Sequence, residues 1–210
     1  MAIYHLAVKS VSRSTGRSAV AAIAYRAGVE LVNERDGLVH DYTRRGGVED
    51  AFIVVPEGAE WAQDRSALWN AAEAAEKRKD AKVAREYELG LPAELDAGQR
   101  RDLVRAFAED IRDRYGVAVD AAIHAPHDYG DDRNHHAHVM TTTRVVDAEG
   151  LGAKTRQLDV RSSASIEVEE IRASWAAQVN DALELAQVAE RVDHRSYARQ
   201  GVEMEPTVKM

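Results

Sequence analysis

The sequence contains no cysteine, only four prolines and no long apolar stretch. Without cysteine the chain can form neither a disulfide nor a thiolate metal site, and this composition suits the reducing cytoplasm. No apolar run approaches the roughly 20 residues that a membrane-spanning helix needs. The N-terminus lacks a basic segment followed by an apolar one, which is the pattern of a secretion signal. We therefore expect a cytoplasmic protein with no membrane partner.

The 210 residues carry a formal net charge of −8, and 45% of them are hydrophobic. This length and this apolar content are enough for one sizeable α/β domain. The net charge alone argues against nucleic-acid binding, which needs excess Lys and Arg. The charge is uneven, however, because residues 1–29 contain four basic side chains and no acid. A locally basic face on an acidic domain is compatible with this distribution.

The periodicity of apolar residues predicts an alternation of strands and helices. Strands are expected at 2–9, 51–55, 83–91, 117–125 and 135–144, a hairpin at 31–43, and helices at 17–27, 59–79, 95–115 and 163–192. Residues 145–162 and the tail 193–210 show no regular pattern. The loop before 135–144 is too short for a helical crossover, so the strands on either side of it should pair antiparallel. The fold class is α+β, with a central antiparallel or mixed β-sheet covered by helices.

Five of the eight histidines lie in residues 123–138. His136 and His138 are two apart on a predicted strand, so both point to the same side of the sheet. His124 ends the preceding strand and can approach this pair. Three neutral imidazoles that converge would form a divalent-metal site with open positions, and their nitrogens suit Zn, Mn, Ni or Co better than Mg. His127 also precedes the pair and is the alternative third ligand.

Two further features could take part in chemistry. Glu86 and Glu88 share one face of a predicted strand, which is either a solvated edge or a place where Glu86 assists the metal or handles a proton. Arg85 faces the other way and could pair with an acid or a phosphate. Tyr25 lies on an Ala-rich helix, where a tyrosine usually packs, although neighbouring arginines could hold a phosphate beside it.

These segments resemble the MobA/MobL relaxases, which are DNA-nicking enzymes of plasmid mobilisation. The resemblance is carried by residues 3–5, 12–13 and 16–28, by 85–92, by 123–126, 132–138 and 141–144, and by 193–197 with Gly201 and Pro206. It covers essentially the whole chain in the same order. His124 rather than His127 fits the Ile-His-x-Pro pattern of the family. The resemblance implies one domain over 1–210, in which a C-terminal helix and tail, 163–210, pack on the site or close over it.

The resemblance implies the histidine–hydrophobe–histidine relaxase fold, with Ala137 as the hydrophobe. It further implies that Tyr25 attacks a phosphodiester at an origin of transfer, leaving a 5′-phosphotyrosine and a free 3′-hydroxyl. His124, His136 and His138 would hold Mn or Mg, with Zn, Ni or Co as alternatives in purified protein. Glu86 would be the acid/base or metal-assisting residue. The chain would thus be a metal-dependent DNA relaxase.

The expected partner is single-stranded DNA at the origin of transfer, comprising a hairpin and a nick site. Accessory relaxosome proteins and a type IV coupling protein are further expected partners. Seven basic side chains are the candidate DNA contacts: Lys9, Arg13, Arg17, Arg26, Arg85, Arg133 and Arg144. Three other functions remain open as alternatives. They are a rolling-circle replication initiator, a non-catalytic origin-binding repressor, and a metallohydrolase that does not act on DNA.

Overall fold

The computed structural model describes residues 4–126 and 131–202. Its centre is a five-stranded sheet in the order β1-β5-β7-β6-β4, and every neighbouring pair is antiparallel. The strands are β1 (Leu6–Ser12), β4 (Val48–Val54), β5 (Lys82–Gly90), β6 (Val119–His124) and β7 (His136–Thr142). The predicted α+β class is confirmed, and so is the antiparallel pairing of β6 with β7.

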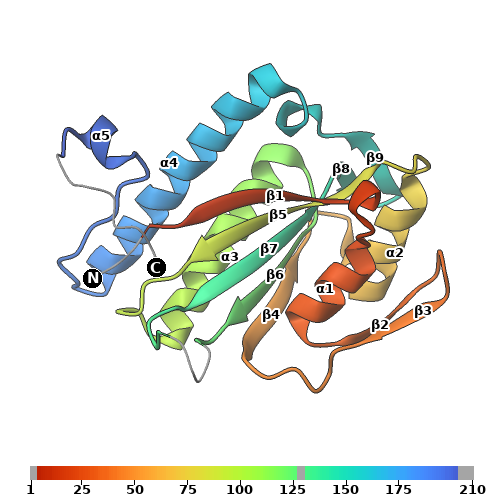
Figure 1. Ribbon diagram of the computed structural model, residues 1–210, viewed down its shortest axis with the longest axis horizontal. Helices are drawn as coiled ribbons and strands as arrows, with labels where there is room; N and C mark the ends of the chain where they lie inside the picture. The colour runs from red at the N-terminus through yellow and green to blue at the C-terminus, as the bar shows by residue number, and fades with distance from the viewer. Residues whose placement is uncertain (1–3, 127–130, 203–210) are drawn as a thin grey trace.

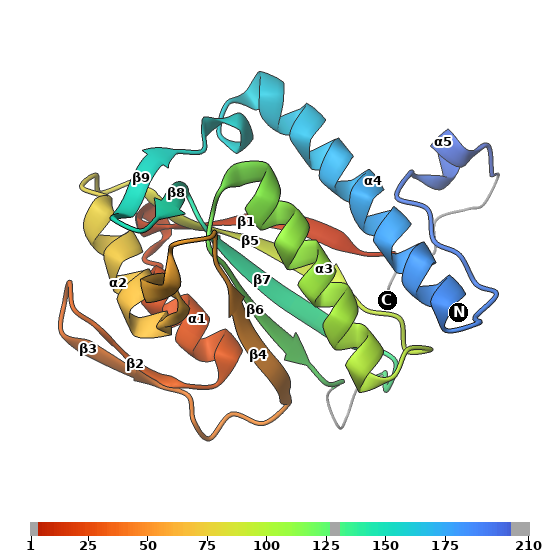
Figure 2. The same ribbon diagram turned by 180° about the vertical axis from the view of Figure 1, so that it is seen from behind.

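Helices cover both faces of this sheet (Figures 1 and 2). On one face lie α1 (Ala19–Ala27) and α2 (Arg65–Ala75), which pack against one apolar core. On the other lie α3 (Ala97–Tyr115) and α4 (Arg161–Leu185), which pack against a second core. We call the α1 side the front face and the α3 side the back face. Because the back face is filled by large apolar side chains, the front face is the one available for polar chemistry.

Two small hairpins flank the sheet. The first, β2 (Glu30–Asn33) with β3 (Leu38–Asp41), was predicted from the sequence. The second, β8 (Arg144–Asp147) with β9 (Gly150–Lys154), lies where a loop was expected, so that expectation was wrong. The side chain of Asp147 accepts hydrogen bonds from the backbone N–H groups of residues 149 and 150, which fixes the turn between these strands.

Short helical turns complete the secondary structure. They are η1 (Arg13–Thr15), η2 (Glu60–Gln63), η3 (Arg156–Leu158) and α5 (Tyr197–Gln200). No helix in the described part of the chain is both long enough and apolar enough to cross a membrane.

Two helices are shorter than the apolar periodicity predicted. The helix expected from residue 59 begins at 65, because Asp64 accepts the N–H of Ala67 at 2.8 Å and caps it. The helix expected to reach residue 192 ends at Leu185. Beyond that point the chain folds back, and Asn180 holds Val192 with two hydrogen bonds of 2.8 and 3.0 Å.

Helix α4 packs against the back face of the sheet, while the expectation that residues 163–210 pack on the site stays a prediction. Ile171, Trp175, Val179 and Leu183 of this helix are buried in the back core with α3. The helix therefore buries its apolar side chains on the face opposite the histidines described below. Residues 203–210 lie outside the described part of the chain.

One buried acid links α2 to the sheet. Asp120 of β6 is fully buried and accepts two hydrogen bonds from Arg65, at 2.8 and 2.9 Å, and one from the Trp69 indole N–H at 2.9 Å. The paired geometry satisfies a carboxylate that would otherwise be costly to bury. The pair therefore orients the start of α2 against the front face.

Replacing Asp120 should destabilise the protein strongly. Asp120→Ala leaves the Arg65 guanidinium and the Trp69 N–H without their acceptor, and the loss should be about 3 kcal/mol in the free energy of unfolding. Urea denaturation measures it. The matched control is Asp113→Ala, which removes an exposed carboxylate paired with Arg112 and should change stability by less than about 0.5 kcal/mol. Equal effects of the two variants would contradict this account.

Candidate functional site

Three histidine rings meet on the front face at one end of the sheet. His124 ends β6 and lies directly opposite His136, the first residue of β7, while His138 is two residues further along β7. The centroids of the three rings are 5.2, 5.2 and 5.4 Å apart. The alternation of side chains along β7 brings this about, because residues two apart share a face. His127, the alternative third ligand, lies outside the described residues.

Each ring is oriented by an oxygen that accepts a hydrogen bond from one of its nitrogens. His124 donates from Nε2 to the backbone carbonyl of Arg26 at 2.8 Å. His136 donates from Nδ1 to the carbonyl of Asn134 at 3.0 Å, and His138 donates from Nδ1 to Glu86 at 2.7 Å. In a neutral imidazole the other nitrogen then carries the lone pair. Metal-binding histidines are commonly held in this way.

The donor chemistry and the ring spacing fit a divalent metal. Three imidazoles on one ion at ordinary bond lengths place their ring centroids roughly 5 Å apart, which matches the observed separations. Across residues 4–126 and 131–202, however, no three His, Asp or Glu side chains are arranged as they stand to hold an ion. The rings are thus gathered at the right spacing, and their nitrogens would have to turn inward to share a metal.

Burial keeps His124 in the neutral form. The ring is 3% exposed. Loss of solvation on burial lowers the pKa of His124 to about 4, although the hydrogen bond to the Arg26 carbonyl acts in the opposite direction. A neutral imidazole is the form that can ligate a metal. The ring therefore needs no deprotonation before it binds an ion at neutral pH.

Glu86 lies directly beside this cluster. β5 is an internal strand between β1 and β7, so the solvated edge considered from the sequence is wrong for Glu86, which is 1% exposed. Both carboxylate oxygens accept hydrogen bonds from Arg26, and one also accepts from His138. Burial alone would raise the pKa of Glu86, but the hydrogen bonds from His138 and Arg26 outweigh it and lower the pKa to about 2.

Tyr25 and Arg26 occupy the last turn of α1. Ser18 caps the start of this helix, and Gly28, at φ +65°, ends it where a Cβ would meet the side chain of Val48 at 3.2 Å. The last carbonyls of a helix have no partner within it. The carbonyl of Arg26 is taken by His124, and that of Tyr25 by the Arg45 guanidinium at 2.6 Å. The end of α1 is therefore tied to the histidine cluster through Arg26, the residue next to Tyr25.

The Tyr25 side chain is held by two residues that sequence reasoning missed. The guanidinium carbon of Arg45 lies 3.9 Å from the centre of the Tyr25 ring, and the Tyr42 ring meets it edge-on at 5.2 Å. Tyr25 nevertheless keeps 46% of its surface exposed. Arg45 follows the first hairpin in a turn, and nothing in its local pattern signals this contact. The phenol is thus fixed in direction and open to solvent.

A cavity of about 620 Å³ opens beside Tyr25, and we call it the α1 pocket. Its charged lining is almost entirely basic: Arg13, Arg17, Arg26, Arg35, Lys77, Arg78 and Lys79, together with Asp36. The excess of positive charge on one face of an acidic chain is the distribution that phosphate binding requires. Three of the predicted DNA contacts, Arg13, Arg17 and Arg26, line this pocket with Tyr25.

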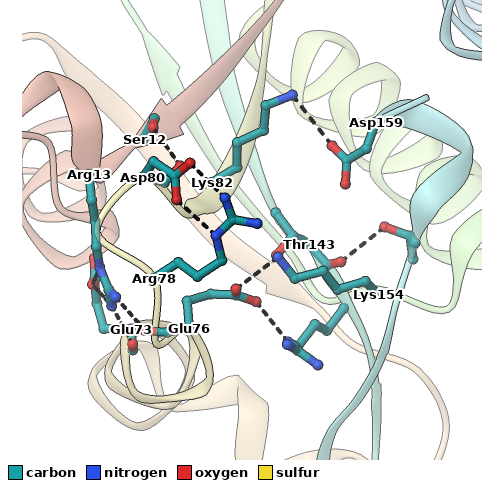
Figure 3. Close-up of polar contacts among 12 residues, drawn as sticks. Ser12, Arg13, Glu73, Glu76, Arg78, Asp80, Lys82, Thr143, Lys154 and Asp159 are labelled. Atoms are coloured by element: carbon teal, nitrogen blue, oxygen red, sulfur yellow. Dashed lines mark hydrogen bonds and ion pairs between the residues drawn. The ribbon is translucent and has the colours of Figure 1, made fainter. Parts of the chain in front are cut away.

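Three of the candidate DNA contacts, including Arg13 of the α1 pocket, have guanidinium groups engaged inside the protein. Arg13 is bound to Glu73 and to backbone carbonyls at the end of α2 (Figure 3). Arg85 is 3% exposed and binds Thr155 and Asp159. Arg144 pairs with Glu76 at 2.8 Å. Because their guanidinium groups already have acceptors, these three fix neighbouring segments, and their contact with DNA stays a prediction.

The remaining two candidates are exposed. Lys9 of β1 pairs with Glu88 across the β1–β5 ladder, and Arg133 pairs with Asp131 at 2.8 Å. Both lie on the surface, where such pairs contribute little and exchange readily with other anions. Their geometry leaves both residues accessible to a phosphate.

Comparison with known sequences identifies the family. A model described as the MobA/MobL family matches residues 17–210. The chain belongs to the MobA/MobL family. Mobilization protein MobL of Acidithiobacillus ferridurans is 43% identical over 233 residues, which cover 99% of this chain and 61% of that relative. Conjugal transfer protein TraA of Rhizobium radiobacter is 32% identical over 238 residues, covering 100% of this chain and 21% of TraA. This MobA/MobL chain therefore spans less than two thirds of the length of either relative.

Solved structures share the fold of this MobA/MobL chain. One, from work on vancomycin resistance transfer in Staphylococcus aureus, has a TM-score of 0.81 at 29% identity and covers 93% of this chain and 100% of that one. The conjugative relaxase TrwC, in a metal-free complex with oriT DNA, has a TM-score of 0.60 at 11% identity, covering 97% and 86%. TrwC has also been solved with metal bound, at a TM-score of 0.57 and 10% identity, covering 86% and 70%. The predicted relaxase fold is confirmed.

The low pKa of His124 predicts a specific dependence of stability on pH. In the unfolded chain the His124 ring takes up a proton at its ordinary pKa of 6.5, whereas in the folded chain it does so only at about 4. The folded state therefore loses no stability through His124 above pH 6.5, and loses progressively more as the pH falls from 6.5 to 4. With a chelator present, wild type should therefore lose about 3 kcal/mol relative to His124→Gln over that interval. Urea unfolding at several pH values measures this difference. A difference that does not change with pH would contradict it.

Proposed function

We propose that this chain nicks one strand of DNA at an origin of transfer and remains joined to the cut end through Tyr25. The hydrogen bond between His124 and the Arg26 carbonyl carries the proposal, because it couples the helix end that bears Tyr25 to the histidine cluster. Family membership supports the same conclusion. In this proposal the phenol, the cluster and the basic pocket surround one phosphodiester.

The Tyr25 oxygen attacks the phosphorus of the scissile phosphodiester. A bond forms between this oxygen and phosphorus, the phosphorus–O3′ bond breaks, and the departing strand leaves with a 3′-hydroxyl after taking up a proton. The products are a 5′-phosphotyrosine and that hydroxyl. One phosphodiester replaces another, so the hydroxyl can attack the phosphotyrosine and rejoin the strand. Arg45 holds the attacking phenol from above its ring.

His124, His136 and His138 would hold a divalent metal, which would polarise a phosphate oxygen and stabilise the charge of the transition state. Mn or Mg is the proposed physiological ion, and Zn, Ni or Co would also suit three nitrogens. Glu86 is ionised at neutral pH and binds His138 and Arg26. Its role is therefore to orient His138 and raise the basicity of that ring, and this fits better than a role as general acid.

The substrate is single-stranded DNA that carries a hairpin and the nick site. The α1 pocket is its proposed seat beside Tyr25, since its charged lining is mainly basic and includes Arg17, Lys77 and Lys79. Residues 1–210 would form one nicking domain acting in the cytoplasm, with relaxosome proteins and a type IV coupling protein as further partners. The relatives named mobilization or conjugal transfer proteins favour this function over a replication initiator, a repressor or a metallohydrolase.

Removing the phenolic oxygen should abolish the covalent adduct. With Mn²⁺ and single-stranded DNA from the origin, wild type should give a protein–DNA band on a denaturing gel, and Tyr25→Phe should reduce it at least about 10³-fold because the nucleophile is gone. Tyr42→Phe is the matched control. It removes the hydroxyl from the ring that packs against Tyr25 and should keep activity within about tenfold.

An adduct that persists in Tyr25→Phe would place the nucleophile elsewhere. Cleavage without any adduct in wild type would indicate a metallohydrolase, and DNA binding without cleavage on the mapped origin would indicate a repressor. Each result would overturn the proposal in a different way.

Loss of the Glu86 charge should weaken metal binding. Glu86→Gln keeps the shape of the side chain but removes the carboxylate that orients His138, and the Kd for Mn²⁺ should rise about 10–100-fold. Isothermal titration calorimetry measures the change. Glu88→Gln, on the same strand but paired with Lys9, is the control and should bind Mn²⁺ as wild type does. Unchanged binding in Glu86→Gln would contradict the assisting role.

A further inference from the structure

A second cavity, of about 970 Å³, lies at the edge of the sheet where the chain enters β1. We call it the tail pocket. Residues 4–6, α4 and the segment 191–200 enclose it. That segment contains the Asp193–Tyr197 motif, to which the nicking chemistry gives no role. The cavity is larger than the α1 pocket.

The charges of the tail pocket favour an anion. Four arginines line it against two acids. Both acids are already matched, since Arg199 binds Glu169 and Arg195 binds Asp193, each at 2.6 Å. Arg172 and Arg191 bring the lining to an excess of two positive charges, and Arg191 also pairs with Glu184, which lies outside the lining, at 3.5 Å. In a chain of net charge −8, such a local excess indicates a surface that attracts phosphate.

An exposed aromatic ring lies in the same cavity. Tyr197 opens the short helix α5 with 54% of its surface exposed and lines the tail pocket. Arginines that follow a backbone, combined with an aromatic face on which a base can stack, are the chemistry by which proteins hold single-stranded nucleic acid. A small inorganic anion would not need the ring.

The tail pocket reaches to within two strands of the histidine site. His5 lines it, and the carbonyl of His5 accepts a hydrogen bond from Gly90, which in turn lies opposite His136. His5 is therefore two strand spacings, about 10 Å, from the cluster. Lys9, four residues further along, binds Glu88 on the front face, so His5 faces the same way.

The two pockets lie at opposite ends of β1. The α1 pocket is lined by Val11 and Arg13, and the tail pocket by residues 4–6. The separation along the strand is about 20 Å. Between them, on the front face, lie Glu86 and His138. A strand whose scissile phosphate reaches the histidines from one pocket would thus leave in the direction of the other.

We propose that the tail pocket binds phosphates and one base of the nicked DNA strand, on the side of the scissile phosphate that leads away from the α1 pocket. Arg172 and Arg191 contact the backbone, and Tyr197 stacks on a base. The inference rests on the proposed nicking function and adds a second anchor for the same strand. The strand is then gripped on both sides of the bond that breaks, which holds the two ends together for rejoining.

The test uses the nick position mapped by the adduct assay and the full chain in a Tyr25→Phe background, which prevents cleavage. Three single-stranded oligonucleotides are compared by fluorescence anisotropy. One extends about eight nucleotides on both sides of the nick, and each of the others lacks one flank. Arg172→Gln with Arg191→Gln removes the unbalanced charge. Arg112→Gln with Arg114→Gln removes the same charge from α3, on the back face.

The Arg172/Arg191 variant should bind the long oligonucleotide about tenfold more weakly, with a salt dependence lowered by about 1.4 in log–log slope, as expected for two phosphates. This loss should vanish for the oligonucleotide that lacks the flank leading away from the α1 pocket. It should persist for the oligonucleotide that lacks the other flank. Tyr197→Ala should show the same selectivity. The Arg112/Arg114 variant should bind all three oligonucleotides as the parent does.

Equal losses on all three oligonucleotides, or none on any, would overturn the proposal while the nicking function stands. If wild type forms no adduct, the nicking function fails first and this inference fails with it. Circular dichroism of each variant shows that it is folded, so a folding defect is distinguished from a lost contact.

Discussion

The site depends on the hydrogen bonds that tie the last turn of α1 to the sheet. Arg26 makes two of these contacts. Its carbonyl accepts a hydrogen bond from His124, and its guanidinium binds Glu86, which in turn accepts a hydrogen bond from His138. Two of the three histidines are therefore oriented through one residue of the helix. Since Tyr25 is the neighbour of that residue, any movement of α1 shifts the phenol and the ring orientation together. Orientation of this kind is what covalent catalysis on a phosphate requires.

The acidic composition does not conflict with a phosphate substrate, because the acidic side chains of the front face are already paired with basic side chains of the protein. Glu73 binds Arg13 and also accepts the N–H of Ala19 at the start of α1, while Glu76 binds Arg144 and Lys154 (Figure 3). Their charge is thereby neutralised inside the protein. The cations of residues 77–79 and of α1 then dominate the pocket beside Tyr25. Net charge describes the whole chain, whereas binding depends on the local distribution.

Much of this could be predicted from the sequence, and the reasons for the failures are physical. The strands and the meeting of His124, His136 and His138 follow from period-2 patterning and a short loop. The second hairpin was missed because its apolar pattern is short, although the turn residues Asp147 and Gly150 signal it. The role of Arg85 depends on Thr155 and Asp159, which are distant in sequence. Arg45 was missed for the same reason, since only tertiary structure brings it over Tyr25.

The central claim is that Tyr25, and no other hydroxyl, receives the phosphate. The most direct measurement is to trap the adduct on an oligonucleotide whose departing fragment, the one that carries the 3′-hydroxyl, is too short to stay bound, digest the adduct, and map the modified peptide by mass spectrometry. The account predicts a nucleotide phosphate on the peptide that contains Tyr25, and none on the peptide that contains Tyr42, whose ring lies 5.2 Å away. A phosphate on Tyr42, or on any residue outside α1, would contradict it.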